Sequence, residues 1–175
     1  MTPAATAAAP PVSQADEAPT ILDIEASGFG AGSYPIEVGF VLPNGDSYCS
    51  LIRPAPHWSH WDPAAQRVHQ IGRDALLHHG RSVDEVAREL NERLRGRTVY
   101  SDGWAHDYVW LATLFDEAKR LPAFRLETLR ALLSEDEAGR WRETKRQVGN
   151  EFPIQRHRAS ADARLLQMTF RRLRP

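Results

Sequence analysis

The chain has 175 residues and a formal net charge of -1 at pH 7, and hydrophobic residues make up 42% of it. This length fits one domain with a proper core and leaves no room for a second domain that holds a large cofactor. Cys49 is the one cysteine, which excludes an internal disulfide and a cysteine-based zinc site. A reducing cytoplasm is the expected location.

Residues 1–18 are rich in alanine and proline, with neither a basic start nor a long apolar run. They resemble neither a signal peptide nor a membrane span, so we expect a disordered tail before a folded domain over residues 19–175. Positive charge is uneven, since the first Lys or Arg is Arg53 and residues 140–174 are rich in arginine. That segment suits a phosphate backbone, although a solvated helix face explains it equally well.

The first half of the domain is expected to form strands. Residues 20–28, TILDIEASG, begin as a short apolar run that predicts a buried strand. A second strand is predicted over 36–42, and Asn44-Gly45 indicates a hairpin turn into a third over 47–53. Residues 54–63 are too broken by proline for a helix or strand, so a loop is predicted there.

Helices and strands alternate in the second half. Ser82 and Glu85 form a capping box, and the apolar spacing after them predicts a helix that Gly96 ends. The remaining elements are predicted as a strand over 98–101, a helix over 105–119, a strand over 124–126, a further helix, and a last helix with Ser160 as N-cap. The sum is an α/β fold whose first three strands are antiparallel and whose later strands join in parallel.

Two carboxylates lie inside the first strand. Asp23 and Glu25 are two residues apart, so the period of a strand points both to one face. Burial of an unpaired carboxylate costs several kcal/mol, which leaves a bound cation, a protonated acid or solvent exposure as the explanations. Taken alone, the pair is compatible with an Asp that faces solvent on an edge strand. A cation would require more acids elsewhere in the chain.

Two more acids follow at suitable places. Asp107 lies just after the strand over 98–101, and Asp162 lies in the first turn of the last helix, five residues after His157. Acids at helix starts are often only favourable partners of the helix dipole, and His157 alone reads as a surface residue. Together, the four acids and the histidine match a site for two hard cations, Mg²⁺ or Mn²⁺ rather than zinc.

These residues also carry a family resemblance. The chain resembles the DEDD superfamily of 3′-5′ exonucleases, in the subgroup whose fifth residue is histidine, which includes ribonuclease T, oligoribonuclease and the epsilon proofreading subunit of replicative DNA polymerase. The three family motifs match Asp23, Glu25, Ser27 and Gly28, then Asp107, then His157, Asp162 and Ala163, and residues 68–71, VHQI, resemble a further family segment.

The second motif departs from the family pattern. It commonly reads His-Asn-x-x-Phe-Asp, whereas this chain has Asp-Gly-Trp-Ala-His-Asp over residues 102–107. The absent Asn removes a polar contact near the site and puts substrate detail in doubt, not the metal ligands. Asp102 is the alternative ligand if the motif is aligned differently.

The resemblance implies a ribonuclease H-like mixed five-stranded sheet with helices on both faces. It implies hydrolysis of terminal phosphodiesters at the 3′ end of single-stranded DNA or RNA to nucleoside 5′-monophosphates. Two divalent ions would be held by Asp23, Glu25, Asp107 and Asp162, with His157 as general base. Contacts to substrate are assigned to Ser27, Gly28, Phe29 and His69.

Several alternatives stay open. Phe29 either stacks on a base or anchors its loop, and Trp58, Trp61 and Trp104 carry the same ambiguity. A silent nucleic-acid-binding module on the same fold is the competing function, although the complete set of five residues argues against it. No residue identifies a contact to a 2′ hydroxyl, so the sequence does not separate RNA from DNA.

Overall fold

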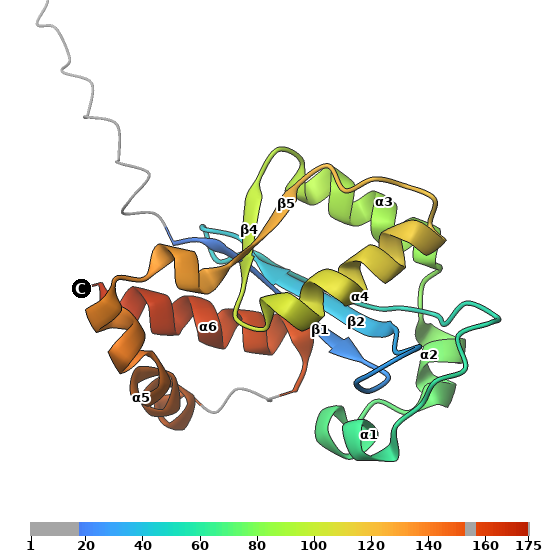
Figure 1. The fold of residues 1–175 in the computed structure, drawn as a ribbon, viewed down its shortest axis with the longest axis horizontal. Helices are drawn as coiled ribbons and strands as arrows, with labels where there is room; N and C mark the ends of the chain where they lie inside the picture. The colour runs from blue at the N-terminus through green and yellow to red at the C-terminus, as the bar shows by residue number, and fades with distance from the viewer. Residues whose placement is uncertain (1–17, 153–156, 175) are drawn as a thin grey trace, which may run out of the picture.

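The computed structural model describes residues 18–152 and 157–174, which form a mixed five-stranded sheet in the order β3-β2-β1-β4-β5 (Figure 1). Its strands are β1 (Thr20–Ala26), β2 (Pro35–Val41), β3 (Ser47–Leu51), β4 (Thr98–Ser101) and β5 (Arg125–Thr128). β1, β2 and β3 pair antiparallel, while β4 pairs parallel with both β1 and β5. The predicted α/β fold with a mixed sheet is confirmed.

Helices cover both faces of the sheet, with α3 and α4 on one side and α5 and α6 on the other (Figure 1). The helices are α1 (Pro63–His69), α2 (Arg73–His79), α3 (Val83–Leu94), α4 (Trp104–Glu117), α5 (Glu135–Glu151) and α6 (Ala159–Leu173), with a 3-10 helix η1 (Leu129–Leu132) before α5. Within the described ranges, no helix is long and apolar enough to cross a membrane.

The central strand β1 divides its side chains between two cores. Leu22 and Ile24 pack into the larger core on the α3 and α4 side. Ile21 packs into the smaller core beneath α6, and the alternation of a strand puts Asp23 and Glu25 on this same face. The two carboxylates therefore face the helix that carries Asp162.

The signals for the hairpin and for the start of α3 are confirmed. Gly45 has φ 91° in the turn between β2 and β3, a conformation that glycine adopts without strain. The Ser82 hydroxyl accepts from the Glu85 backbone N–H, and the Glu85 carboxylate accepts from the Ser82 N–H, so the capping box starts α3. A second capping box, formed by Ser134 and Glu137, starts α5.

The predicted loop over 54–63 is one residue too long, and the two short helices after it were not predicted. Pro63 is the first residue of α1, where its fixed φ suits a helix start, and the Asp62 side chain caps it by accepting from the Ala64 N–H at 2.7 Å. Each of these helices has seven residues and buries few side chains, so no apolar periodicity marks them.

The start of the last helix also differs from the prediction. Ser160 lies inside α6, and the N-cap is Arg158, whose side chain makes no capping bond. The first N–H of the helix, that of Ala159, donates instead to the Glu37 carboxylate of β2 at 2.8 Å. A partner distant in sequence replaces the local cap. At the other end of the chain, Ala18 is buried, and the rest of the predicted tail lies outside the described residues.

Candidate functional site

A pocket of about 330 Å³ lies where β1 and β4 move apart. β1 and β4 pair at only two positions, Thr20 with Val99 and Ile21 with Tyr100, so the strands separate just before Asp23. In open α/β sheets, ligands bind beyond the carboxyl ends of the strands. The usual place is between two strands whose chain connections run in opposite directions along the sheet. The pocket is lined by all five predicted catalytic residues, which are Asp23, Glu25, Asp107, His157 and Asp162.

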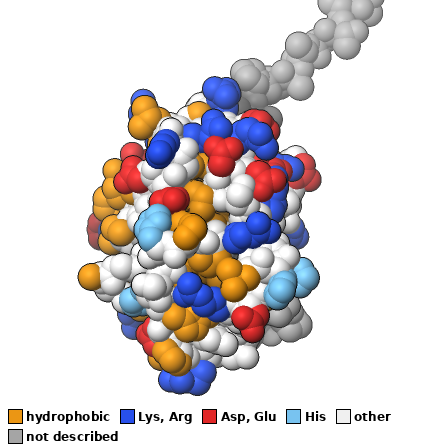
Figure 2. Space-filling model, turned by 90° about the vertical axis from the view of Figure 1, so that its right-hand side faces the viewer, with side chains coloured by type: hydrophobic (Ala, Val, Ile, Leu, Met, Phe, Trp, Pro, Cys, Tyr) orange, Lys and Arg blue, Asp and Glu red, His pale blue; other side chains and the backbone are white. Residues whose placement is uncertain are grey.

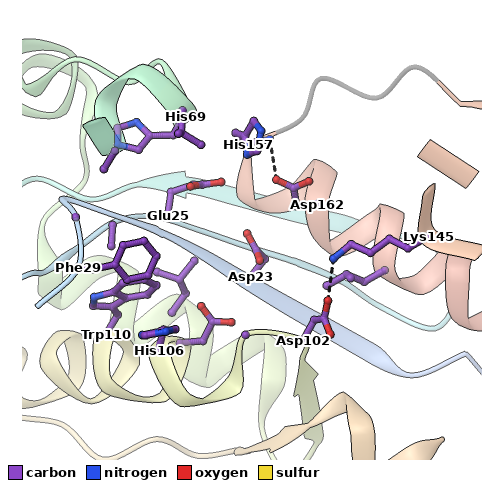
Figure 3. Close-up of a pocket in the computed structure, with 18 residues that line it drawn as sticks. Asp23, Glu25, Phe29, His69, Asp102, His106, Trp110, Lys145, His157 and Asp162 are labelled. Atoms are coloured by element: carbon purple, nitrogen blue, oxygen red, sulfur yellow. Dashed lines mark hydrogen bonds and ion pairs between the residues drawn. The ribbon is translucent and has the colours of Figure 1, made fainter. Parts of the chain in front are cut away.

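Three of these side chains form a group with the geometry of a cation site. Ligand atoms of Glu25, His157 and Asp162 all lie within 4.8 Å of one another (Figure 3). The Asp162 carboxylate also accepts from the backbone N–H of His157 at 2.7 Å, which ties the histidine to the helix. Two carboxylates with one imidazole suit a hard divalent cation such as Mg²⁺ or Mn²⁺.

Asp107 reaches the pocket from the first turn of α4 and is buried. Its Oδ2 accepts a hydrogen bond from the Ser101 hydroxyl at the end of β4. Asp23 lines the same pocket, close enough to Asp107, Glu25 and Asp162 for their charges to raise its pKa. The pocket therefore joins acids from β1, α4 and α6.

Burial and mutual repulsion raise the pKa values of these carboxylates. Burial, and then the charges of neighbouring acids, raise the pKa of Asp23 well above its usual range, while Lys145 acts in the opposite direction. Burial and the Asp162 charge raise the pKa of Glu25 to about 7. Burial likewise raises the pKa of Asp107 to about 7, although the bond from Ser101 opposes it. Raised pKa values of this kind favour a cation in the pocket, because a cation offsets the repulsion among the carboxylates.

The alternative ligand, Asp102, has a different partner. Its Oδ2 lies 2.8 Å from the Nζ of Lys145 on α5, at the edge of the same pocket (Figure 3). Asp107 instead occupies the buried position beside Asp23. The geometry therefore favours Asp107 over Asp102 as the acid of the second motif.

Ser27, predicted to contact substrate, has its hydrogen bonds inside its own loop. Its hydroxyl accepts from the Tyr34 backbone N–H at 3.1 Å and lies 3.1 Å from the His60 Nδ1. It is 1% exposed and is absent from the described lining of the pocket. The Ser27 hydroxyl therefore holds the loop, and an approach of the Ser27 backbone to substrate stays a prediction.

Gly28, next to it, lines the pocket and has φ 145°. A Cβ at this position would lie 2.6 Å from the Asp62 Cβ and 2.8 Å from the His60 Cε1. Glycine is thus required both by the backbone conformation and by the close approach of the neighbouring loop.

Phe29 and His69 form parts of the pocket wall. Phe29 is 65% exposed, and its ring lies 5.0 Å from that of His106 and 5.7 Å from that of Trp110. His69 is buried, and its Nδ1 accepts from the Ile71 backbone N–H at 3.0 Å. The remaining ring proton of a neutral His69 is therefore on Nε2, an atom without a protein partner among the described residues.

The lining also includes aromatic and charged side chains that no motif singled out, namely those of His106, Trp110 and Lys145. His106 and Trp110 stand four apart on α4 and stack at 5.7 Å, a spacing that the sequence shows but that core packing also produces. Lys145 lies on α5, within the basic segment for which a phosphate backbone was one of two interpretations. Its role depends on how the helices pack.

The tryptophans left open by the sequence have structural partners. Trp58 is buried and stacks on Tyr34 at 5.1 Å. The Trp61 indole donates to the Gln66 side chain at 2.7 Å, and that of Trp104 donates to the Leu126 carbonyl at 3.1 Å. None of the three is among the described lining residues of the pocket.

Four of the eight described arginines between residues 140 and 174 form ion pairs within the protein. These pairs join Arg146 to Glu143, Arg158 to Glu37, Arg172 to Glu151 and Arg174 to Glu137. These pairs favour solvated helix faces over a broad basic surface as the explanation of the segment. Figure 2 shows the face on the right-hand side of Figure 1, away from α5, where Lys and Arg side chains lie among acidic and hydrophobic ones.

Sequence comparison finds neither a matching family model nor a matching curated relative. Among solved structures, exonuclease I from Methylocaldum szegediense aligns with a TM-score of 0.62 and 16% identity over 88% of this chain and 39% of that chain. E. coli exonuclease I in complex with a dT13 oligonucleotide aligns with a TM-score of 0.67 and 13% identity over 89% and 41%. The chain has the exonuclease I fold.

This match confirms the ribonuclease H-like sheet that the family resemblance implied. E. coli exonuclease I with a dA16 oligonucleotide gives a similar alignment, with a TM-score of 0.63 and 13% identity over 86% of this chain and 39% of that chain. The chain thus spans between 39% and 41% of the length of these exonuclease I structures. Sequence identity this low shows a shared fold and does not show a shared activity or substrate.

Proposed function

We propose that the chain is a metal-dependent 3′-5′ exonuclease of the DEDD superfamily, in the subgroup with histidine. It would hydrolyse the terminal phosphodiester of single-stranded DNA or RNA and release nucleoside 5′-monophosphates. One observation carries the proposal: the five residues singled out by three separate motifs line a single pocket. The exonuclease I fold supports it, since two of the matching structures hold single-stranded oligonucleotides.

The carboxylates are proposed to hold two Mg²⁺ or Mn²⁺ ions. Glu25 and Asp162 lie with His157 in one ligand group, and Asp23 extends this group toward Asp107. Two such ions, when bound, stabilise the charge on the attacking and leaving oxygens of an in-line phosphoryl displacement. The raised pKa values support this assignment, because charge repulsion among these acids would be relieved by cations.

His157 is proposed as the general base. Its backbone is fixed by the bond to Asp162, and its ring atoms lie close to the carboxylates of Glu25 and Asp162. A neutral imidazole at this position would take the proton of the attacking water. A general base of this kind contributes roughly 10² to 10⁴ fold in rate.

The wall of the pocket opposite the group of Glu25, His157 and Asp162 is proposed to bind the terminal nucleotide. Phe29, His106 and Trp110 present aromatic surface, and stacking of one base on such a surface is worth about 1 to 3 kcal/mol. Gly28 lets the backbone approach the sugar, and His69 lines the pocket beside it. Lys145 would contact a phosphate.

The test is digestion of matched short RNA and single-stranded DNA, each labelled at the 5′ end, with Mn²⁺ present. The expected result is a ladder that shortens from the 3′ end with release of mononucleotides, and its loss in Asp23→Asn. Comparison of the two substrates also reports the RNA or DNA preference. Binding of the oligonucleotides without cleavage would favour the silent binding module and overturn the proposal.

A further inference from the structure

β2 carries two residues that lie beside the acids of β1. In the antiparallel register, Glu37 is opposite Glu25, and Gly39 is opposite Asp23. Residues directly opposite one another in a sheet point to the same face. Glu37 and Gly39 therefore face α6, as the acids of β1 do, although neither lines the pocket in the described residues.

Glu37 is fully buried and yet has its carboxylate satisfied by the start of α6. Arg158 donates to it with Nε at 2.9 Å and 3.1 Å and with Nη2 at 2.6 Å. The Ala159 backbone N–H donates to the second oxygen at 2.8 Å. Such charge-assisted bonds are short and directional, and an anion at a helix N-terminus is favoured by the helix dipole.

Gly39 lets the helix approach the strand. A Cβ at this position would lie 2.2 Å from the Ser160 backbone N and 2.6 Å from the Ala159 carbonyl carbon. Backbone atoms of a helix cannot move aside as a flexible side chain does. Any residue larger than glycine would therefore push the first turn of α6 away from β2.

The contacts of Glu37 and Gly39 with the start of α6 lie next to His157, the histidine of the site. His157 directly precedes Arg158 and has φ 62°, an unusual conformation for a residue other than glycine. A conformation of this kind persists when its surroundings hold it in place. Here the surroundings are the Arg158 to Glu37 pair on one side and the bond from the His157 N–H to Asp162 on the other.

We propose that Glu37 and Gly39 are positioning residues that fix the start of α6 and thereby set His157 and Asp162 against Glu25. A buried ion pair is weak support for stability, because desolvation offsets much of its attraction. The contribution of the Glu37–Arg158 pair is to place His157 and Asp162 in the site. The inference rests on the proposed function for its kinetic consequence, while its structural consequence is measured independently.

The test compares Glu37→Gln with Glu137→Gln. Glu137 pairs with Arg174 just beyond the opposite end of α6, so its variant is a matched loss of one ion pair far from the pocket. We expect Glu37→Gln to lower kcat and Mn²⁺ affinity by about 10 to 100 fold, as changes behind metal ligands do, with KM nearly unchanged. It should also speed amide hydrogen exchange at His157. The Glu137 variant should leave all of these at parent values.

A second pair of variants guards against loss of folding in Glu37→Gln. Arg158→Lys keeps a positive partner for Glu37 and should retain more activity and more His157 amide protection than Arg158→Ala. Equal effects of Glu37→Gln and Glu137→Gln, or of the two Arg158 variants, would overturn the inference. If the parent protein cleaves no substrate, the proposed function fails, and the exchange rate of the His157 amide still decides whether Glu37 holds it.

Discussion

Lys145 on α5 and Asp102, just after β4, form an ion pair across the edge of the pocket, with Nζ 2.8 Å from Oδ2. Both side chains are partly exposed, and such pairs contribute at most about 1 kcal/mol to stability. Among the described residues that line the pocket, Lys145 is the one Lys or Arg, against five carboxylates, Asp23, Glu25, Asp102, Asp107 and Asp162. It is thus the side chain best suited to a substrate phosphate.

Replacement of Lys145 by Met should weaken substrate binding. Loss of one charge-assisted contact of about 1.4 kcal/mol corresponds to a tenfold lower kcat/KM, which we expect mainly in KM. The dependence of binding on salt should also fall by about one unit of slope, because one phosphate contact is lost. Cleavage of a short labelled oligonucleotide at several salt concentrations measures both.

The control for this variant is Arg146→Met. Arg146 is the next residue on α5, pairs with Glu143 of the same helix and is mostly exposed, so it removes the same charge outside the pocket. It should leave KM within about twofold of the parent value, since screened surface charges contribute little. Equal changes in the two variants would show that only the overall charge matters.

The metal-free protein should lose stability as the pH rises toward 7. Glu25 and Asp107 have pKa values raised to about 7, so the folded state binds their protons more tightly than the unfolded chain does. Their protons stabilise the fold fully below about pH 4, and this contribution is lost between about pH 4.5 and 7. Each kcal/mol lost lowers Tm by about 2 to 4 °C in a chain of this size.

Thermal melting in EDTA and in Mn²⁺, from pH 5 to pH 8, measures this effect. Mn²⁺ should raise Tm most at the high end of the range, where the carboxylates are charged. Asp23→Asn should flatten the pH dependence in EDTA and remove most of the Mn²⁺ effect. A Tm that rises with pH in EDTA would contradict the assignment of crowded acids to this pocket.

Signals that are local in sequence predicted their parts of the structure. The period of two in β1 put Asp23 and Glu25 on one face, and the capping box at Ser82 fixed the start of α3. The spacing of five residues between His157 and Asp162 spans the start of a helix, and one hydrogen bond joins the two. Such signals depend on contacts between residues a few positions apart, which a short stretch of sequence determines.

Features that depend on distant partners were not predicted. The cap of α6 comes from Glu37, more than a hundred residues earlier, so the sequence pointed wrongly to Ser160. Ser27 matched a family motif, yet its hydroxyl is used by Tyr34 and His60, which only the folded loop brings near. Lys145 enters the pocket through the packing of α5. Tertiary packing decided each of these cases.

Gly28 and Gly30 form a matched pair for testing the loop after β1. Both have positive φ, but a Cβ at Gly28 would collide with Asp62 and His60, whereas one at Gly30 meets nothing within 4 Å. Alanine at either position carries backbone strain of about 1 kcal/mol. Gly28→Ala should lower Tm further and reduce kcat/KM, while Gly30→Ala should retain parent kcat/KM. Similar activities of the two variants would remove Gly28 from the substrate wall.

His157 and Asp162 allow chemistry to be separated from metal binding. Asp162→Asn keeps an oxygen that accepts from the His157 N–H, so it removes the charge while it preserves the hydrogen bond. It should reduce both cleavage and the Mn²⁺-dependent rise in Tm, because a charged ligand is lost. His157→Ala should lower kcat by roughly 10² to 10⁴ fold and keep most of the rise in Tm, because the carboxylates remain.

Single-turnover cleavage and melting with and without Mn²⁺ give both quantities for each variant. If His157→Ala cleaves at nearly the parent rate, the histidine takes no proton in the reaction. If it instead loses the Mn²⁺-dependent rise as fully as Asp162→Asn does, its ring is a ligand of the cation rather than the base, as its place within 4.8 Å of both carboxylates also permits.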